Sequence, residues 1–417
     1  MNIKIIPSKL MGRLNAPSSK SFSHRMIIAA ALAGGISEIT NVTSSVDIEA
    51  TVNAMVQLGA KIIEDGSTYT IKGIGEKPAK NACIDCCESG STLRFIIPVA
   101  AVLGCSTEFD GRGKLPTRPI TPFVRELSKH GITFDYNNDM PFGISGKLKG
   151  GEYEIEGNIS SQFISGLMYA LPLCSENSVI RVTSKLESKP YVDMTISALK
   201  CFGIEIKESK DGESVVYNID GGQKYSASNQ SVEGDYSQAA FFFVANALGS
   251  EISIHNLNKN TTQGDKKILE ILHDIGYNDM MKSVMEPFTV DVSDIPDLVP
   301  ILAVLGSFTS GKCRLINAKR LKIKESNRLT ATADALNAIG GKVKTLDDSL
   351  EISPVKEFTG GIVDGCNDHR IVMAAAIAST VSTEPVIIKG AEAVNKSYPS
   401  FFEEFCKLGG SAKIISE

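Results

Sequence analysis

Lysine and arginine side chains recur in this sequence at the starts of apolar segments that we expect to be helices. They are Lys20, Arg25, Arg94, Arg118, Lys324, Arg328, Arg370 and Lys396, in PSSKSFSHRM, ESGSTLRF, LPTRPI, LKIKESNRL, CNDHRIVM and NKSYPSF. A helix N-terminus presents unpaired N–H groups and the positive end of the helix dipole, so a cation placed there adds to a site for phosphate or carboxylate. Several such sites in one chain indicate a ligand with several negative charges.

Each of these cations, taken alone, can equally be half of a surface ion pair, which is common and of little energetic value. Taken together they favour ligand binding, because a cation at a helix N-terminus opposes the dipole unless an anion compensates. Serine hydroxyls accompany the cations, and they suit phosphate oxygens, although a helix N-cap is the alternative role for each. These serines are Ser18, Ser19, Ser21, Ser89, Ser91, Ser160 and Ser161.

The composition is that of an ordinary globular protein with room for two or three domains, since 417 residues are 42% hydrophobic and 22% charged. The formal net charge of -5 argues against a broad nucleic-acid surface. Nine scattered cysteines indicate a reducing compartment, and Cys83, Cys86 and Cys87 lack the further ligands that a zinc site needs. No segment reaches the roughly 20 apolar residues of a membrane span, so we expect a cytoplasmic protein. From the cysteine pattern we expect no metal.

A glycine-punctuated pattern recurs six times along the chain. An apolar helix ends in Leu-Gly or a similar pair and a strand follows, with the glycines at 59, 131, 203, 276, 340 and 409, separated by 72, 72, 73, 64 and 69 residues. Alanine-rich helices followed by β-branched strands interleave with these copies, as in AAALAGGISEIT and PVAAVLGCSTEF. Glycine at a helix end is expected because the left-handed conformation there is costly for other residues.

The repeat predicts an α/β fold in which a βαβαββ unit is used six times, three per domain. Because the helices are too rich in alanine for an exposed face, we expect an inside-out α/β barrel, with buried helices ringed by sheets. The predicted domains are residues 19–231 and residues 1–18 plus 232–417, with the active site in the cleft between them. We take SASNQSVEGD as the linker, and the N-terminal strand can pair with either half.

The motifs, taken in order, resemble those of the 5-enolpyruvylshikimate-3-phosphate synthases, a family of enolpyruvyl transferases. The resemblance runs from end to end through PSSKSFSHR, SGSTLR, LPTRPI, SSQF, SKPY, IPD, IKESNR, NDHR and KSYP. It implies two domains of three βαβαββ units and no cofactor. It also implies transfer of the enolpyruvyl group of phosphoenolpyruvate to the 5-hydroxyl of 3-phosphoshikimate, in the shikimate pathway to chorismate.

The resemblance also implies roles for individual residues. Those matching the 3-phosphoshikimate site are Lys20, Ser21, Arg25, Ser160, Ser161, Gln162, Ser188, Tyr191, Asp297, Arg320 and Lys324. Those matching the phosphoenolpyruvate site are Lys20, Gly90, Arg94, Arg118, Gln162, Arg328, Arg370 and Lys396.

The reaction needs a base for the hydroxyl and an acid/base at the methylene carbon. We expect Asp297 to take the hydroxyl proton, Glu325 to exchange the C3 proton, and Lys20 to stabilise charge and protonate the leaving phosphate. His369 is expected to orient its neighbours more than to act as a base. We also expect the empty domains to stay apart, because unpaired cations lining a cleft repel one another.

The sequence departs from the commoner family pattern at two places. Glu88-Ser89 stands before Gly90 where many members carry Asn-Ala, and Arg320 stands where many have Asn. An acidic residue beside an anion site either weakens phosphoenolpyruvate binding or points to solvent, and we favour solvent for Glu88. Gly90 leaves the space that the inhibitor glyphosate takes in this family.

Three other functions stay open at this point. The enolpyruvyl transferase acting on UDP-N-acetylglucosamine shares the repeat but usually carries a reactive cysteine in a loop that here reads GRGKLPTRPI. A non-catalytic anion-binding protein would have no use for carboxylates among phosphate ligands. Nucleic-acid binding would call for a basic stripe and stacking aromatics, yet the chain has no Trp and 6% aromatic residues. We therefore expect a monomer that acts on two small anions.

Overall fold

The computed structural model of the chain describes residues 1–75, 77–212, 214–277 and 284–415. It divides into two units, Met1–Pro17 with Gly234–Glu417 (unit 1) and Ser18–Glu233 (unit 2). Each unit has its own hydrophobic core. The boundaries predicted after residues 18 and 231 differ from these by one and two residues.

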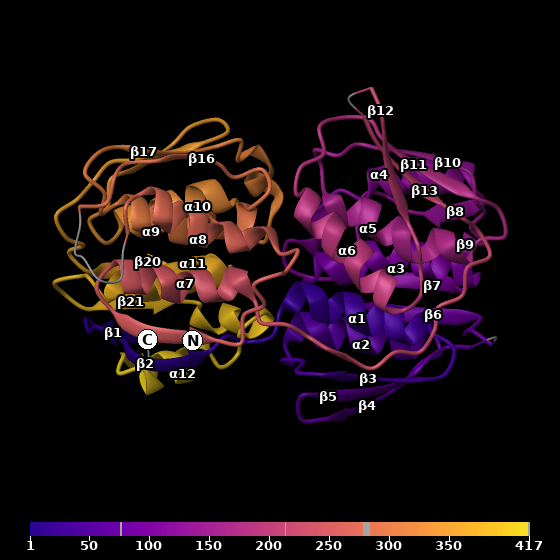
Figure 1. Cartoon of the computed structure of the whole chain (residues 1–417), viewed down its shortest axis with the longest axis horizontal. Helices are drawn as coiled ribbons and strands as arrows, with labels where there is room; N and C mark the ends of the chain where they lie inside the picture. Colours follow the sequence, from indigo (N-terminus) through magenta and orange to yellow (C-terminus); the bar gives the residue numbers. More distant parts are fainter. Residues whose placement is uncertain (76, 213, 278–283, 416–417) are drawn as a thin grey trace. The chain divides into compact units, whose positions relative to one another are not determined.

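Unit 2 contains three copies of the repeat, each with two helices and a four-stranded sheet (Figure 1). Its helices are α1 (Lys20–Leu32), α2 (Val46–Gln57), α3 (Gly90–Leu103), α4 (Thr121–Lys129), α5 (Ser161–Ala170) and α6 (Lys189–Cys201). The first sheet has the order β14 (Gln230–Ser231), β3 (Ile36–Thr40), β5 (Thr68–Lys72), β4 (Lys61–Asp65). The second is β6 (Asn81–Asp85), β7 (Ser106–Asp110), β9 (Phe142–Gly146), β8 (Ile132–Asp135), and the third is β10 (Glu152–Ile155), β11 (Ser178–Val182), β13 (Ser214–Ile219), β12 (Lys207–Asp211).

Unit 1 repeats this plan with helices α7 (Tyr236–Ala247), α8 (Lys267–Asp274), α9 (Val299–Gly306), α10 (Arg328–Asn337), α11 (His369–Ser379) and α12 (Phe401–Lys407). One sheet is β16 (Thr289–Asp291), β17 (Cys313–Ile316), β19 (Leu350–Ile352), β18 (Val343–Thr345). Another is β20 (Gly361–Asp364), β21 (Val386–Lys389), β1 (Asn2–Ile6), β22 (Ser411–Ile415). Among the described residues the remaining sheet pairs β15 (Glu251–His255) with β2 (Met11–Asn15), and residues 278–283 of that repeat lie outside the description.

The four-stranded sheets share one pairing rule. A parallel pair comes first, as in β6 with β7, and an antiparallel pair such as β8 and β9, or β1 and β22, then adds to the second strand. The strand that follows each alanine-rich helix therefore lies inside its sheet. The repeat seen in the sequence is thus a repeat of sheet topology.

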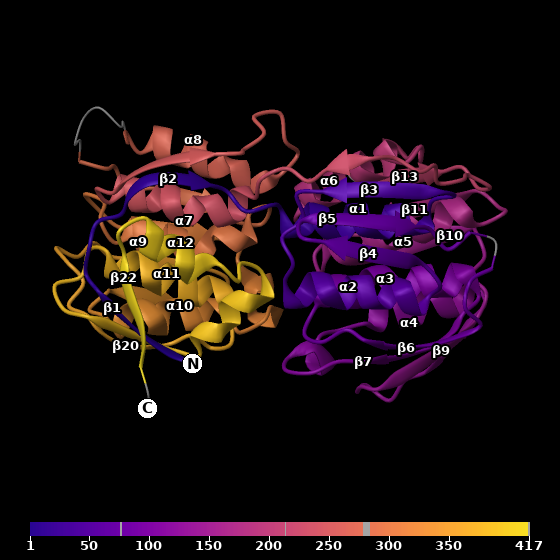
Figure 2. The same cartoon turned by 90° about the horizontal axis from the view of Figure 1, so that it is seen from below.

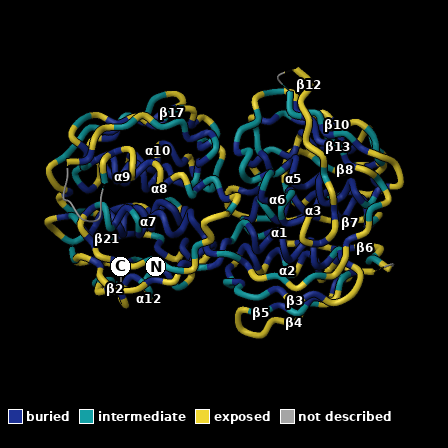
Figure 3. Tube along the Cα trace, viewed as in Figure 1, coloured by how far each residue is buried: buried dark blue, intermediate teal, exposed yellow. Residues whose placement is uncertain are grey.

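The alanine-rich helices are buried, as their composition predicts. Every residue of α11 is buried, and so are twelve residues of α3. Within each unit buried helices such as α3 and α11 lie inside and the sheets lie around them (Figures 1 and 2), and the burial colouring of these inner helices is mostly dark (Figure 3). In the part of the chain that is described, no helix has both the length and the apolar character needed to cross a membrane.

The six glycines of the repeat all have a positive φ, between 79° at Gly276 and 115° at Gly59. Each comes within three residues of the end of its helix. The prediction of left-handed glycines at these helix ends is therefore confirmed, and in the copies other than that of Gly276 a strand follows within four residues of the glycine.

Two segments differ from simple expectation. The stretch taken as a linker is partly a strand, because β14 pairs in parallel with β3 at Gln230↔Ile39 and Ser231↔Thr40. The N-terminal segment pairs within unit 1, where β1 lies between β21 and β22 and β2 pairs with β15. Strands from the chain ends thus complete sheets begun elsewhere in the sequence.

Candidate active site

The start of helix α3 gathers polar side chains from three parts of unit 2. Ser89 caps the helix and Gly90 is its first residue. The amide of Gln162 bridges two side chains of α3: its Oε1 accepts from Arg94 Nη1 at 2.8 Å and its Nε2 donates to Ser91 Oγ at 2.9 Å. Three of the predicted phosphoenolpyruvate residues therefore lie together here.

The absence of a side chain at Gly90 matters in this group. A methyl group there would stand 2.6 Å from Arg118 Nη1, 3.2 Å from Arg94 Nη1 and 3.5 Å from Gln162 Oε1. Both guanidinium groups are buried, at 7% exposure for Arg118 and 5% for Arg94. The two cations and the helix N-terminus form a site suited to an anion.

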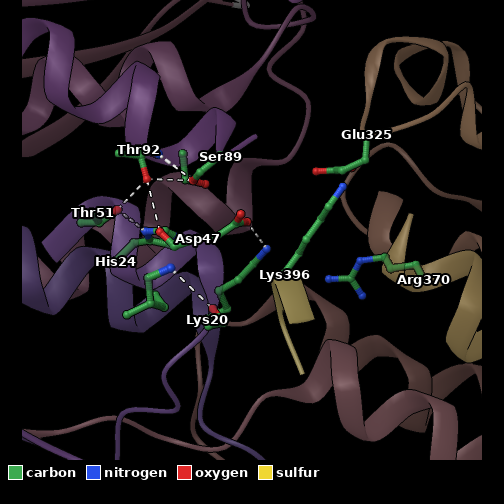
Figure 4. Close-up of polar contacts among 12 residues, drawn as sticks. Lys20, His24, Asp47, Thr51, Ser89, Thr92, Glu325, Arg370 and Lys396 are labelled. Carbon is green, nitrogen blue, oxygen red and sulfur yellow. Dashed lines mark hydrogen bonds and ion pairs between the residues drawn. The ribbon is translucent and has the colours of Figure 1, made fainter. Parts of the chain in front are cut away.

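Lys20, the first residue of α1, is paired with a carboxylate that the sequence did not single out. Its Nζ lies 2.7 Å from Asp47 Oδ2, and the two side chains are 16% and 11% exposed. Asp47 belongs to the first turn of α2, where an acidic residue also complements the helix dipole. Figure 4 labels both residues.

Arg25 is held by protein groups on several sides. Its Nε donates to Thr195 Oγ1, its Nη1 to the backbone oxygen of Ser21 and its Nη2 to that of Tyr191, at 2.9, 2.7 and 2.8 Å. The guanidinium also lies 5.2 Å from the ring centre of Phe95. Burial lowers the pKa of Arg25. The structure thus brings Ser21, Arg25 and Tyr191 together.

The three serines predicted to surround a phosphate stand at two helix starts. Ser160 caps α5 by accepting from Gln162 N at 3.3 Å, and Ser161 is the first residue of that helix. Ser188 precedes α6 and has a left-handed backbone with φ of 57°. Such a conformation is uncommon for a residue other than glycine and is concentrated at functional sites.

In unit 1 the corresponding group is centred on Arg328, the first residue of α10, which is 1% exposed. Its guanidinium contacts three carboxylates: Asp368 at 2.9 Å, Asp297 at 2.9 Å and Glu325 at 2.6 Å. Burial disfavours its charged form, but the attraction of the three carboxylates is larger and raises the pKa of Arg328 above its ordinary value.

Asp297, in the short helix η4 (Pro296–Leu298), is the point where the other cations meet. It accepts from Arg328 Nη1 at 2.9 Å and from Arg370 Nη2 at 2.8 Å, and Lys324 Nζ lies 3.9 Å away. Burial disfavours the carboxylate, but these cations hold the pKa of Asp297 far below its usual range. Burial lowers the pKa of Lys324 to about 8, against the attraction of Asp297 and Glu325.

The remaining predicted residues of unit 1 take separate positions. Lys396 Nζ donates to the backbone oxygen of Asn367 at 2.8 Å, next to the residue that caps α11. Arg320, in η5 (Lys319–Ile323), donates to Ser293 O at 3.3 Å. Glu325, Arg370 and Lys396 are labelled in Figure 4.

The expectation that the cations are unpaired is wrong for Lys20, Arg328 and Arg370. Carboxylates from neighbouring elements neutralise them, so mutual repulsion of free cations does not describe these groups. Asp47 and Asp368 were missed. Asp368 is fully buried and also caps α11, and its place inside the quoted motif NDHR was the only signal.

Glu88, which we expected to point to solvent, is half-buried and lies against the loop that contains Gly113. A Cβ at Gly113 would stand 2.3 Å from its Oε2, so the carboxyl group lies next to the loop backbone at Gly113. The loop therefore accommodates the acidic side chain. Across residues 1–75, 77–212, 214–277 and 284–415, no cluster of three metal-ligating side chains occurs.

Comparison with known proteins gives the family. A sequence model of the family described as EPSP synthase (3-phosphoshikimate 1-carboxyvinyltransferase) matches residues 5–405. The chain belongs to the EPSP synthase family. A relative from Clostridium novyi (strain NT) named 3-phosphoshikimate 1-carboxyvinyltransferase is 46% identical, with 98% of each chain covered. One of the same name from Clostridium kluyveri is 44% identical over 98% of this chain and 97% of its own.

Solved structures share the fold at lower identity. An EPSP synthase from Acinetobacter baumannii has a TM-score of 0.81 and 24% identity, covering 99% of this chain and 100% of its own. The enolpyruvyl transferase NikO from Streptomyces tendae has a TM-score of 0.79 and 15% identity, covering 99% and 98%. These likenesses confirm the predicted α/β fold class for this member of the EPSP synthase family.

Proposed function

We propose that this chain transfers the enolpyruvyl group of phosphoenolpyruvate to the 5-hydroxyl of 3-phosphoshikimate. The products are 5-enolpyruvylshikimate 3-phosphate and inorganic phosphate. The family and the names of its relatives support this proposal. The observation that carries it is the group in unit 1, where Asp297 and Glu325 lie among cations that suit an anionic substrate.

Two groups of residues in unit 2 would bind anionic groups of the substrates. In unit 2, Arg94, Arg118 and the N-terminus of α3 suit one phosphate or carboxylate. The serines at the starts of α5 and α6 offer hydroxyl donors to a second phosphate. We assign the first group to phosphoenolpyruvate and the second, with Arg25, to 3-phosphoshikimate.

The reaction is an addition followed by an elimination. The 5-oxygen of 3-phosphoshikimate forms a bond to C2 of phosphoenolpyruvate while the hydroxyl loses its proton and C3 gains one. The bond from C2 to the phosphate oxygen then breaks and C3 loses a proton, so the enol ether and phosphate leave. Asp297 takes the hydroxyl proton, Glu325 gives and removes the C3 proton, and Lys20 protonates the departing phosphate.

The pairing of Asp297 explains how its basicity can depend on substrate. While Arg328 and Arg370 hold the carboxylate, it stays ionised but is a weak base. A substrate carboxylate that draws either guanidinium away removes part of that stabilisation. The base would then be strengthened only when phosphoenolpyruvate is bound.

We further propose that the enzyme works as a monomer in the cytoplasm and that residues of both units take part in turnover. All the assigned residues belong to one chain, and each unit supplies part of the set. Neither unit alone holds both Lys20 and the pair Asp297 and Glu325. The proposal therefore requires both units for turnover.

The test is release of phosphate from phosphoenolpyruvate with each of two acceptors. We expect release with 3-phosphoshikimate and none with UDP-N-acetylglucosamine, and the reverse would overturn the assignment. Glu325→Gln and Asp297→Asn are expected to lower kcat about a hundredfold or more, because each removes an acid/base group. The matched control Asp334→Asn changes an exposed carboxylate on α10 and is expected to retain full activity.

A further inference from the structure

A buried chain of hydroxyl groups links the first three helices of unit 2. His24 on α1 contacts Thr51 Oγ1 on α2 through Nδ1 at 2.7 Å. Thr51 Oγ1 lies 2.7 Å from Thr92 Oγ1 on α3, which donates to Ser89 Oγ at 2.8 Å. Figure 4 shows these four residues and the contacts that join them.

All four side chains are withdrawn from solvent, at 1% exposure for His24 and Ser89 and 0% for Thr51 and Thr92. Polar groups buried in this way are costly unless each finds a partner, so such networks specify one arrangement more than they add stability. A second contact runs beside the chain, because Lys20 on α1 pairs with Asp47 on α2. His24 lies one helical turn after Lys20, and Thr51 lies one turn after Asp47.

Each hydrogen bond in the chain of hydroxyl groups has one donor and one acceptor, which follow from the contacts of Thr92. Thr92 donates its single hydroxyl proton either to Ser89 Oγ or to the backbone oxygen of Asp47, which is 3.4 Å away. Thr92 therefore accepts from Thr51, and Thr51 accepts from His24 Nδ1–H. Within the described residues His24 Nε2 has no partner, which suits a bare lone pair better than a buried N–H group.

The chain of hydroxyl groups ends at the N-cap of α3. Ser89 Oγ accepts from both the backbone N of Thr92, at 3.1 Å, and its hydroxyl, so the first turn of α3 is tied through Thr51 to α1. Gly90, the first residue of that helix, follows immediately.

We propose that His24, Thr51 and Thr92 are positioning residues, which hold the phosphoenolpyruvate end of α3 in place relative to Lys20 through a neutral Nδ1–H histidine. This inference rests on the proposed function for the identity of the ligand at Gly90. The surroundings agree with a neutral ring, since burial first, and then Lys20 and Arg25, keep the pKa of His24 well below 6.5.

Kinetics of Thr51→Val and Thr92→Val test the positioning role. Each removes one hydroxyl and keeps the side-chain volume, so we expect KM for phosphoenolpyruvate to rise about three- to tenfold. We expect kcat and KM for 3-phosphoshikimate to stay within about twofold, and Thr51→Ser to restore the unmutated KM. The control is Thr107→Val, because Thr107 is 2% exposed in the same unit and its hydroxyl donates to the backbone oxygen of Cys105, away from the hydroxyl chain.

A loss of thermal stability with unchanged KM values, or an equal effect of Thr107→Val, would overturn the positioning role. Nitrogen-15 NMR of the unmutated full chain with labelled histidine reports the protonation of both ring nitrogens of His24. It requires neither turnover nor a substituted protein. His24 is expected to show a protonated Nδ1 and a bare Nε2, without titration between pH 6 and 8.5. A protonated Nε2 would contradict the proton order even if the enzyme is active, whereas an inactive unmutated enzyme would contradict only the proposed function.

Discussion

At the scale of single residues, the charged groups of both units are paired across long stretches of sequence. Lys20 meets Asp47 and Arg370 meets Asp297, and each carboxylate comes from a different element. An anionic substrate must therefore compete with carboxylates of the protein. By the proposed function, the proton affinities of these groups change when a substrate displaces a carboxylate.

The basic residues could be predicted from sequence because their position at helix starts is a local pattern. The partners could not, since Asp47 resembles any acidic residue in the first turn of a helix, and Asp368 resembles any N-cap. Pairing depends on how α1 meets α2 and how α10 meets α11, and no local pattern records this. The same limit explains why the hydroxyl chain through Thr51 was not foreseen.

Lys324 predicts a pH dependence. Its pKa of about 8 means that the ammonium group loses its proton above that pH, so kcat/KM for 3-phosphoshikimate is expected to fall there. Stability should change in the opposite sense. Between pH 8 and 10.5 the unfolded lysine keeps a proton that the folded lysine loses, so the free energy of unfolding increases as the pH rises through this range. In Lys324→Arg the cation persists, so the alkaline fall of kcat/KM should disappear, and an unchanged profile between pH 6 and 10 would contradict the assignment.

Gly90 predicts a change in inhibitor selectivity. In Gly90→Ala the new methyl group would stand 2.6 Å from Arg118 Nη1, so the guanidinium must move. We expect the inhibition constant of glyphosate to rise about tenfold and KM for phosphoenolpyruvate to rise less, because overpacking costs about 1 kcal/mol or more and the inhibitor occupies the narrowed space. Steady-state inhibition kinetics measure both constants, and equal increases would refute the assignment of this space.

At the scale of elements, the repeat was predictable because its signals are local. A left-handed glycine such as Gly59 or Gly131 marks the helix end in each copy, and alanine-rich sequence marks the buried helices. The exchange of strands between copies was not predictable. The strands β1, β2 and β14 each join a sheet whose other strands lie far away in sequence, so their own residues carry no sign of the partner.

The helix-end glycines predict a measurable loss of stability. Gly59→Ala places a Cβ at φ of 115°, with its nearest neighbours 3.6 Å or farther, so the cost is conformational. We expect the free energy of unfolding to fall by about 1 to 2 kcal/mol in urea titrations. Gly34→Ala is the control, since that glycine has neither a positive φ nor an atom within 4 Å of the added Cβ. Equal stability of the two variants would show that the left-handed cap is not the reason for glycine at 59.

At the scale of the whole molecule, the proposed site residues are divided between two units that the chain connects twice, at Pro17–Ser18 and at Glu233–Gly234. Lys20 belongs to one unit and Glu325 to the other. Turnover by the proposed mechanism therefore depends on both units acting on the same pair of substrates.

Ligand binding is expected to make the molecule more compact. Anionic 3-phosphoshikimate would contact cations from both units, and bringing them together removes water from the reacting groups. Small-angle scattering should show a smaller radius of gyration at saturating 3-phosphoshikimate than without it. An unchanged radius would count against closure, and shikimate without its phosphate is the control for nonspecific effects.

By the proposed mechanism, Glu325 exchanges a proton with C3 of phosphoenolpyruvate while the acceptor oxygen adds to C2. The most direct measurement is turnover of both substrates in deuterium oxide, followed by mass spectrometry of the enol ether. We predict deuterium in its methylene group, together with a rate in Glu325→Gln about a hundredfold or more lower. A product free of deuterium, or a Glu325→Gln enzyme as fast as the unmutated one, would contradict this role of Glu325.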